Sequence, residues 1–246
     1  MSRAGVSFSI ASDAAWAPGV ETHDEWLAWA DSISTIAGSA EPPVRAMAPM
    51  LRRRAGFLGK MALQVAYDCL GDRTDVPMVF CSRHGEVARS VELLADLAQD
   101  TPLSPASFGL SVHNASCGLF TIARSDRSNA SALAAGHSTI EHAVIEACGL
   151  LADGEPAVLL VAYDTVLPSL YSSFQDCDEQ PHAWAWLMQA PASDVLSLHW
   201  SAADSADSPA AGSRPAGLEV LRFHLRKDSE LTRTCENRRW HWSRNA

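Results

Sequence analysis

The chain has 246 residues, 47% of them hydrophobic, which is enough to bury the core of one large domain or of two small ones. Its 29 acidic and 19 basic side chains give a net charge of −10, which disfavours attraction to nucleic acid or to anionic lipid. No apolar run approaches the ~18 residues of a membrane span, and residues 1–19 lack the uninterrupted apolar segment of a signal peptide, so we expect a cytoplasmic protein.

The first predicted elements are a strand and then helices. A short β-rich run at residues 6–10 is expected to be a strand, and residues 25–36 have the Trp-rich pattern of an amphipathic helix. Residues 47–70 are rich in helix formers. They predict either one long helix or two short helices that are broken near Gly56.

Strands and helices alternate in the middle of the chain. Residues 77–82 (PMVFCS) form an unbroken apolar run, typical of a strand that is buried on both faces, and residues 87–98 carry a helical apolar stripe. Residues 108–112 are a further strand candidate, and residues 116–123 follow as a helix. A polar stretch at residues 124–131 separates this helix from the next element.

A capping box predicts where the next helix begins. Ser138 and Glu141 have the S-x-x-E spacing, and apolar residues continue at helical spacing until Gly154. Residues 157–162 (AVLLVA) directly follow as a buried strand.

Two Trp-containing runs come next, at residues 184–188 and 195–200, and we expect them to be strands that can pair with each other. The alternation of strands and helices along the chain predicts an α/β fold, with a layered sheet and parallel crossovers.

A low-complexity segment divides the C-terminal part of the chain. Residues 201–217 are rich in Ala, Ser, Pro and Asp, which indicates a flexible linker. A short helix is expected just after it, and Trp240 and Trp242 would lie on one face of an extended terminal segment. We therefore divide the chain into a domain of residues 1–200, the linker, and a tail of residues 218–246 that packs back on the domain or onto a partner.

One stretch has the pattern of a turn that carries a nucleophile. In SVHNASCGLFTIA (residues 111–123), Cys117 stands where an extended run meets a helix, and His113 lies four residues before it. Because a catalytic thiol needs a lowered pKa and a nearby base, Cys117 with His113 is a candidate centre for acyl transfer or thioester hydrolysis. A cysteine that only packs in the core is the other reading. Ser116 fails the G-x-S-x-G pattern because Asn114 occupies the first position.

The sequence contains no other catalytic or cofactor motif that we recognise. The six cysteines show no C-x-x-C spacing, the histidines show no H-E-x-x-H pattern, and there is no G-x-G-x-x-G or Walker-type loop. We therefore expect neither a metal site nor a cofactor.

Two longer segments, residues 104–123 and 134–168, resemble the N-terminal half of the β-ketoacyl synthases of the thiolase fold. The motifs SRHGE (residues 82–86), LSPASF and SVHNA make the chain most similar to the short chain length factors of aryl polyene and xanthomonadin-type pigment clusters. The resemblance covers residues 6–189. It implies the N-terminal half of a thiolase-like fold, with a layered mixed sheet and helices.

The resemblance also implies which position should carry the nucleophile. In active synthases the cysteine stands in an A-C-S-S/G-type motif and is followed by a Leu and an Ile that face the core. When Leu119 and Ile122 take those two positions, Ala115 occupies the cysteine position. Cys117 then lies two residues past it, about 200° around the helix. The family's two active-site histidines come from a C-terminal half, and no TxxHGTxT-like or NxFGFGG-like segment is present here.

A partner is implied as well, because half of a two-repeat fold leaves an apolar face that favours association by about 25 cal/mol per Å². In this family the partner is a full-length β-ketoacyl synthase, and the interface includes the strand before the nucleophile turn. The expected interface residues on that strand are Phe108, Leu110, Val112 and His113. On the following helix, Ser116 and Phe120 are expected near the partner's tunnel, which holds an acyl chain bound to an acyl carrier protein.

These implications give one leading hypothesis and two alternatives. The leading hypothesis is a catalytically inactive chain length factor that forms a heterodimer with a condensing β-ketoacyl synthase and shapes its acyl pocket in aryl polyene biosynthesis, a polyketide- or fatty-acid-like pathway. The alternatives are an independent Cys117-dependent acyltransferase or thioesterase, and a scaffold that only stabilises the synthase. The sequence leaves open whether the arginines at residues 52–54 contact a carrier protein or form a solvated helix face.

Overall fold

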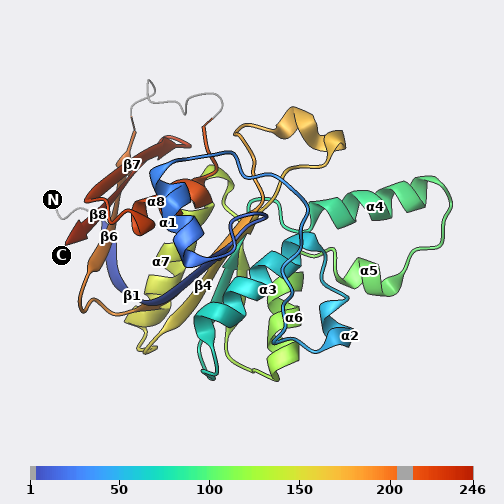
Figure 1. Cartoon of the computed structure of the whole chain (residues 1–246), viewed down its shortest axis with the longest axis horizontal. Coiled ribbons are helices and arrows are strands. Elements are labelled where there is room, and N and C mark those ends of the chain that lie inside the picture. Colours follow the sequence, from blue (N-terminus) through green and yellow to red (C-terminus); the bar gives the residue numbers. More distant parts are fainter. Residues whose placement is uncertain (1–3, 204–212, 246) are drawn as a thin grey trace.

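The computed structural model describes residues 4–203 and 213–245, in which eight strands form one mixed sheet (Figure 1). The strand order is β3-β2-β4-β5-β1-β6-β8-β7, with β3, β2 and β4 parallel and the remaining neighbours antiparallel. The strands are β1 (Gly5–Trp16), β2 (Met78–Cys81), β3 (Ala130–Leu133), β4 (Val158–Asp164), β5 (His182–Gln189), β6 (Val195–Ala202), β7 (Glu230–Cys235) and β8 (Arg238–Asn245). This mixed sheet confirms the predicted α/β class.

Helices cover both faces of the sheet. They are α1 (His23–Asp31), α2 (Pro49–Arg52), α3 (Phe57–Leu70), α4 (Val87–Ala98), α5 (Pro105–Gly109), α6 (Ala115–Arg124), α7 (Thr139–Ala152) and α8 (Ala216–Leu225), with short 3₁₀ segments η1 (Gly136–Ser138) and η2 (Ser169–Phe174). Helices α1, α7 and α8 pack on one face, and α3 and α6 on the other. The alternation of side chains along β5 serves both layers, because Trp184 and Trp186 face the first core while Ala183 and Ala185 face the second.

Of the two alternatives for residues 47–70, the structure has two helices with a break near Gly56. Helix α2 ends at Arg52 and α3 begins at Phe57, with Gly56 as the N-terminal cap residue of α3. The predicted strands at residues 6–10, 77–82 and 157–162 correspond to β1, β2 and β4.

The strand predicted at residues 108–112 is wrong, because the chain forms helix α5 over Pro105–Gly109 and then a turn. The Ser104 side chain accepts a hydrogen bond from the Ser107 backbone N–H, and Pro105 occupies the first helical turn. Both are signals for a helix start, and they outweigh the β propensity of the residues that follow. Strand β3 forms one edge of the sheet, opposite the edge formed by β7, and it begins inside the stretch that we expected to be a polar separator.

Two further expectations are corrected. The Ser138–Glu141 capping box does not form: Ser138 makes no side-chain cap to α7, and its Oγ donates to Glu236 Oε2 at 3.0 Å. The two Trp-containing strands, β5 and β6, do not pair with each other because β1 lies between them. Strand β1 therefore holds the sheet together. It is long enough to pair with β6 along its first part and with β5 along the rest.

The C-terminal segment packs against its own sheet. Strand β8 pairs with β6 from Val195↔Asn245 to Ala202↔Arg238, and the side chains of Trp240 and Trp242 are fully buried. The expected linker at residues 201–217 falls largely on residues 204–212, which lie outside the described residues; β6 extends to Ala202 and α8 begins at Ala216. In the described part of the chain, no helix is long and apolar enough to cross a membrane.

Candidate functional site

The turn before α6 does not have the expected strand-to-helix form, because helix α5 and a short turn precede it. Asn114 is the N-terminal cap residue of α6, and Ala115 is the first residue of the helix. The Ala115 backbone N–H donates to the backbone oxygen of Val112 at 3.1 Å, so this group is already used within the turn. The Ala115 methyl group is 7% exposed and has no atom that can react as a nucleophile.

Cys117 lies in the core and away from this position. Its side chain is 3% exposed and packs with the residues of α3 and α6 that cover the sheet. Burial raises the pKa of the Cys117 thiol to about 12, so the thiolate is essentially absent at neutral pH. The position of Cys117 is that of a small apolar side chain.

His113 contacts a different part of the chain. Its Nε2 lies 3.1 Å from the backbone oxygen of Leu133, the last residue of β3. The other side of the ring packs on Gly85, where a Cβ would lie only 2.5 Å from Nδ1. Among the described residues no hydrogen bond joins His113 to Cys117, so the structure does not assemble the predicted catalytic pair.

Ser116 belongs to a buried polar group under the turn. Its Oγ donates to Glu86 Oε1 at 3.4 Å, and it also interacts with the hydroxyl of Tyr163. Burial raises the pKa of Glu86, while Arg89 and Ser116 act in the opposite direction. A Cβ at Gly59 on α3 would lie 3.1 Å from Ser116 Oγ, which shows how closely α3 approaches this group.

Phe120 is fully buried in this chain's own core. Its ring centroid lies 4.8 Å from that of Tyr67 and 6.0 Å from that of Phe80. The structure therefore places Phe120 behind the surface of α6, where a change in its size would act through the packing of α6 on the sheet.

The remaining predicted interface residues lie on an open end of the molecule. Phe108 is 66% exposed and Val112 is 45% exposed, while Leu110 is half-buried against α3 and α6. Neither α4 nor α5 buries a single residue, and the apolar side chains of Leu94 and Leu97 on α4 point to solvent. Figure 1 shows α4 and α5 extending away from the sheet at the end opposite to β6, β8 and β7.

The sequence analysis missed a second part of this open end. The segment η2 lies between β4 and β5, and none of its residues is buried. Leu170 is 68% exposed and Phe174 is 65% exposed. The spacing of Leu170 and Phe174 gives no clear signal for this segment, because a 3₁₀ helix has three residues per turn and these residues are four apart.

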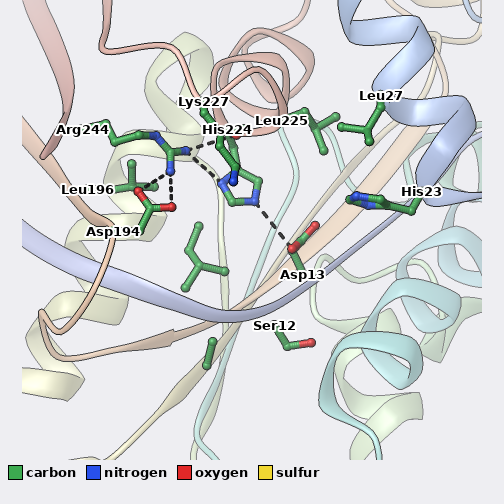
Figure 2. A pocket seen from close by; sticks show the side chains of 12 residues that line it. Ser12, Asp13, His23, Leu27, Asp194, Leu196, His224, Leu225, Lys227 and Arg244 are labelled. Atoms are coloured by element: carbon green, nitrogen blue, oxygen red, sulfur yellow. Dashed lines mark hydrogen bonds and ion pairs between the residues drawn. The ribbon is translucent and has the colours of Figure 1, made fainter. Parts of the chain in front are cut away.

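A cavity of about 380 Å³ lies at the other end, between β1, α1, the end of α8 and β8. Figure 2 shows contacts among four of its polar side chains: Arg244 lies between Asp194 and His224, and His224 Nε2 is 3.7 Å from Asp13 Oδ1. A hydrogen bond with His224 is the main cause that lowers the pKa of Asp13, and burial acts in the opposite direction. These contacts join β8 to α8 and to the residue before β6, and they join α8 to β1. Within the described ranges, no group of three or more His, Cys, Asp or Glu residues is placed to hold a metal ion.

Comparisons with known proteins agree with this geometry. Residues 26–243 match the sequence profile of the family described as "Beta-ketoacyl synthase, N-terminal domain". The chain is similar to a chain in the structure of the ketosynthase ApeO in complex with its chain length factor ApeC from Xenorhabdus doucetiae, with 27% identity, a TM-score of 0.84, and coverage of 97% of this chain and 99% of that chain.

Two more distant structures share the fold. The ishigamide ketosynthase/chain length factor matches at 16% identity with a TM-score of 0.63, covering 84% of this chain and 70% of that chain. A chain of the AntDE:AntF complex, a type II acyl carrier protein with its ketosynthase, matches at 10% identity with a TM-score of 0.72 and complete coverage of both chains. No curated protein matches the chain.

Proposed function

Because the chain belongs to the β-ketoacyl synthase N-terminal domain family, we propose that it is a catalytically inactive chain length factor that pairs with a condensing β-ketoacyl synthase and shapes its acyl pocket in aryl polyene biosynthesis. The similar chain from Xenorhabdus doucetiae comes from a complex of a ketosynthase with its chain length factor, and the match spans nearly all of both chains. This chain and its relative therefore share one fold over nearly their whole lengths.

The observation that carries the proposed partner is the open end. Helices α4 and α5 bury no residue, yet they expose large apolar side chains, including Leu94, Leu97 and Phe108. A free protein gains no stability from such a surface, whereas a partner that covers it gains about 25 cal/mol for each Å² of apolar area removed from water. We assign this end to the ketosynthase.

The interface is proposed to include β3 in place of the strand expected at residues 108–112. Strand β3 pairs with β2 on one side only and forms one edge of the sheet, so its outer backbone groups can extend the sheet into another subunit. His113 links β3 to the exposed residues after α5. Its ring bonds to the end of β3, and in the chain it directly follows the exposed Val112.

Catalytic inactivity is supported by the turn before α6. Ala115 provides no nucleophile, and the neighbouring thiol of Cys117 is buried with a raised pKa. Nothing in the geometry favours the alternative of an independent Cys117-dependent acyltransferase or thioesterase, since its proposed base, His113, bonds elsewhere.

Co-expression with the condensing synthase of the same pathway, followed by size-exclusion chromatography and product analysis, tests this function. We expect co-elution as a heterodimer, and a product length that differs from that of the synthase without this chain. Separate elution with unchanged product length would refute the proposal.

The shaping of the acyl pocket has its own test. A Val112→Trp substitution enlarges an exposed side chain beside the turn and should shorten the polyene product, while Leu27→Trp at the opposite end serves as the control. An unchanged product distribution in an intact heterodimer would favour the scaffold alternative, in which the chain only stabilises the synthase.

A further inference from the structure

The SRHGE turn (Ser82 to Glu86) follows β2 and connects three segments that are distant in the sequence. Its first two residues bind the end of β4: Ser82 Oγ and the Arg83 backbone N–H both donate to Asp164 Oδ1, at 2.8 and 2.9 Å. The Gly85 backbone N–H donates to Ser82 Oγ at 2.8 Å and closes the turn on itself. The turn is thereby fixed on the sheet.

The middle of the turn holds the segment that contains η2. The Arg83 guanidinium makes two parallel hydrogen bonds to the Asp176 carboxylate, each 2.9 Å long, and His137 Nε2 lies 2.8 Å from Asp176 Oδ2. This bidentate geometry fixes orientation as well as distance. Asp176 comes two residues after the end of η2.

Glu179 connects the two ends of the same segment, and His84 lies beside it. His84 Nε2 lies 3.5 Å from Glu179 Oε1, while Glu179 Oε2 accepts a hydrogen bond of 2.7 Å from the Leu167 backbone N–H. Leu167 precedes η2 and Glu179 follows it, so this carboxylate closes the segment into a loop.

The end of the turn supports the region of Ala115. His113 packs on Gly85, which has a φ of +57° and no room for a side chain, and Ser116 donates to Glu86. The SRHGE turn therefore fixes both η2 and the start of α6. The start of α6 belongs to the open end and comes next after α5 in the chain.

We propose that Arg83 is a positioning residue that holds η2 through Asp176, so that Leu170 and Phe174 extend the α4–α5 surface into one docking site for an apolar surface of the ketosynthase. This inference rests on the proposed function and names a further part of the same interface. The ketosynthase is the favoured occupant because η2 lies at the same end of the molecule as α4 and α5 (Figure 1), and because the same turn fixes η2 and the start of α6.

A double-mutant cycle tests the role of Arg83. The affinity of the chain for the synthase is measured by titration for the wild type, for Arg83→Lys, for the pair Leu170→Ser with Phe174→Ser, and for all three changes combined. Lysine keeps the charge but cannot form the bidentate pair. We expect each set of changes to raise the Kd about tenfold. The combined variant should bind no more weakly than the Leu170/Phe174 variant, because Arg83 acts only through η2.

The matched control is Arg226→Lys, which alters a pair with Asp31 at the other end of the chain and should leave the Kd unchanged. Additive effects in the cycle, or an unchanged Kd for the Leu170/Phe174 variant, would overturn the inference. A change in self-association of the chain without any change in synthase binding would also overturn it. If the wild type itself does not bind the synthase, it is the proposed function that fails.

Discussion

The two ends of the sheet differ in how their apolar surface is covered. At the β6–β8–β7 end, the chain covers itself: Trp240 and Trp242 are fully buried, and α8 packs over them. At the α4–α5 end, the helices and η2 bury nothing and expose Phe108, Leu170 and Phe174. The C-terminal segment covers apolar surface at one end only. The apolar side chains at the other end stay exposed in this chain.

The closed end is expected to give the largest effect on stability. Arg233 pairs with Glu141, which is fully buried, and with Glu219 at 2.8 Å. An Arg233→Met substitution leaves the Glu141 charge buried without a partner, so the free energy of unfolding should fall by about 3–5 kcal/mol. Urea denaturation measures this change.

Arg226→Met is the matched control, because Arg226 pairs with the exposed Asp31. It should cost less than about 1 kcal/mol. Equal losses in the free energy of unfolding for the two variants would show that the buried pair of Arg233 and Glu141 does not stabilise the closed end.

The open end should respond in binding and not in folding. A Phe108→Ser substitution removes an apolar side chain that is 66% exposed, so the free energy of unfolding should change by less than about 0.5 kcal/mol. The affinity for the ketosynthase should fall by about 2 kcal/mol, as is typical when an aromatic anchor of an interface is lost. Calorimetric titration against the synthase measures this; a loss of stability without a loss of affinity would place Phe108 in the fold alone.

A smaller, pH-dependent effect is expected at the cavity of the closed end. The folded state lowers the pKa of Asp13, mainly through His224, so the ionised carboxylate stabilises the fold at neutral pH. Asp13→Asn should therefore cost less than about 1 kcal/mol at pH 7. The difference from the wild type should shrink as the pH falls through the lowered pKa and vanish below it. Thermal unfolding across this pH range measures the difference in stability, with Asp72→Asn as the exposed control. A stability difference between Asp13→Asn and the wild type that grew toward acid pH would contradict this explanation.

The smallest effect is expected at Cys117. Because its thiol is buried and has a raised pKa, Cys117→Ala should leave polyene production by the co-expressed pair nearly unchanged. Product yield from cells that carry each variant is the measurement. Abolished production with an intact heterodimer would restore the enzyme alternative.

Local sequence patterns predicted helices and strands well where the apolar residues of the pattern are buried in the structure. The apolar run of β2 and the helix-former content of α3 were sufficient, because both elements are buried as their patterns require. The pattern around Phe108 failed, because the cap formed by Ser104 and Pro105 turns an apparent strand into α5.

Contacts between distant residues could not be predicted from local patterns. Glu141 has the spacing of a capping residue, yet its carboxylate is used by Arg233, 92 positions away. The hydrogen bonds between Arg83 and Asp176 likewise join residues that are 93 positions apart, so no local pattern indicates them. The sequence placed Ala115 and Cys117 two residues apart on one helix, but only the structure shows that the thiol of Cys117 lies in the core.

Whether a ketosynthase covers the open end, as we propose, can be decided from the mass of the mixed proteins in solution. Light scattering after size exclusion should show a 1:1 complex of this chain with the condensing synthase, and the complex should be weakened by Phe108→Ser but not by Leu27→Ser at the opposite end. Two separate species, or a complex equally sensitive to both substitutions, would contradict the account.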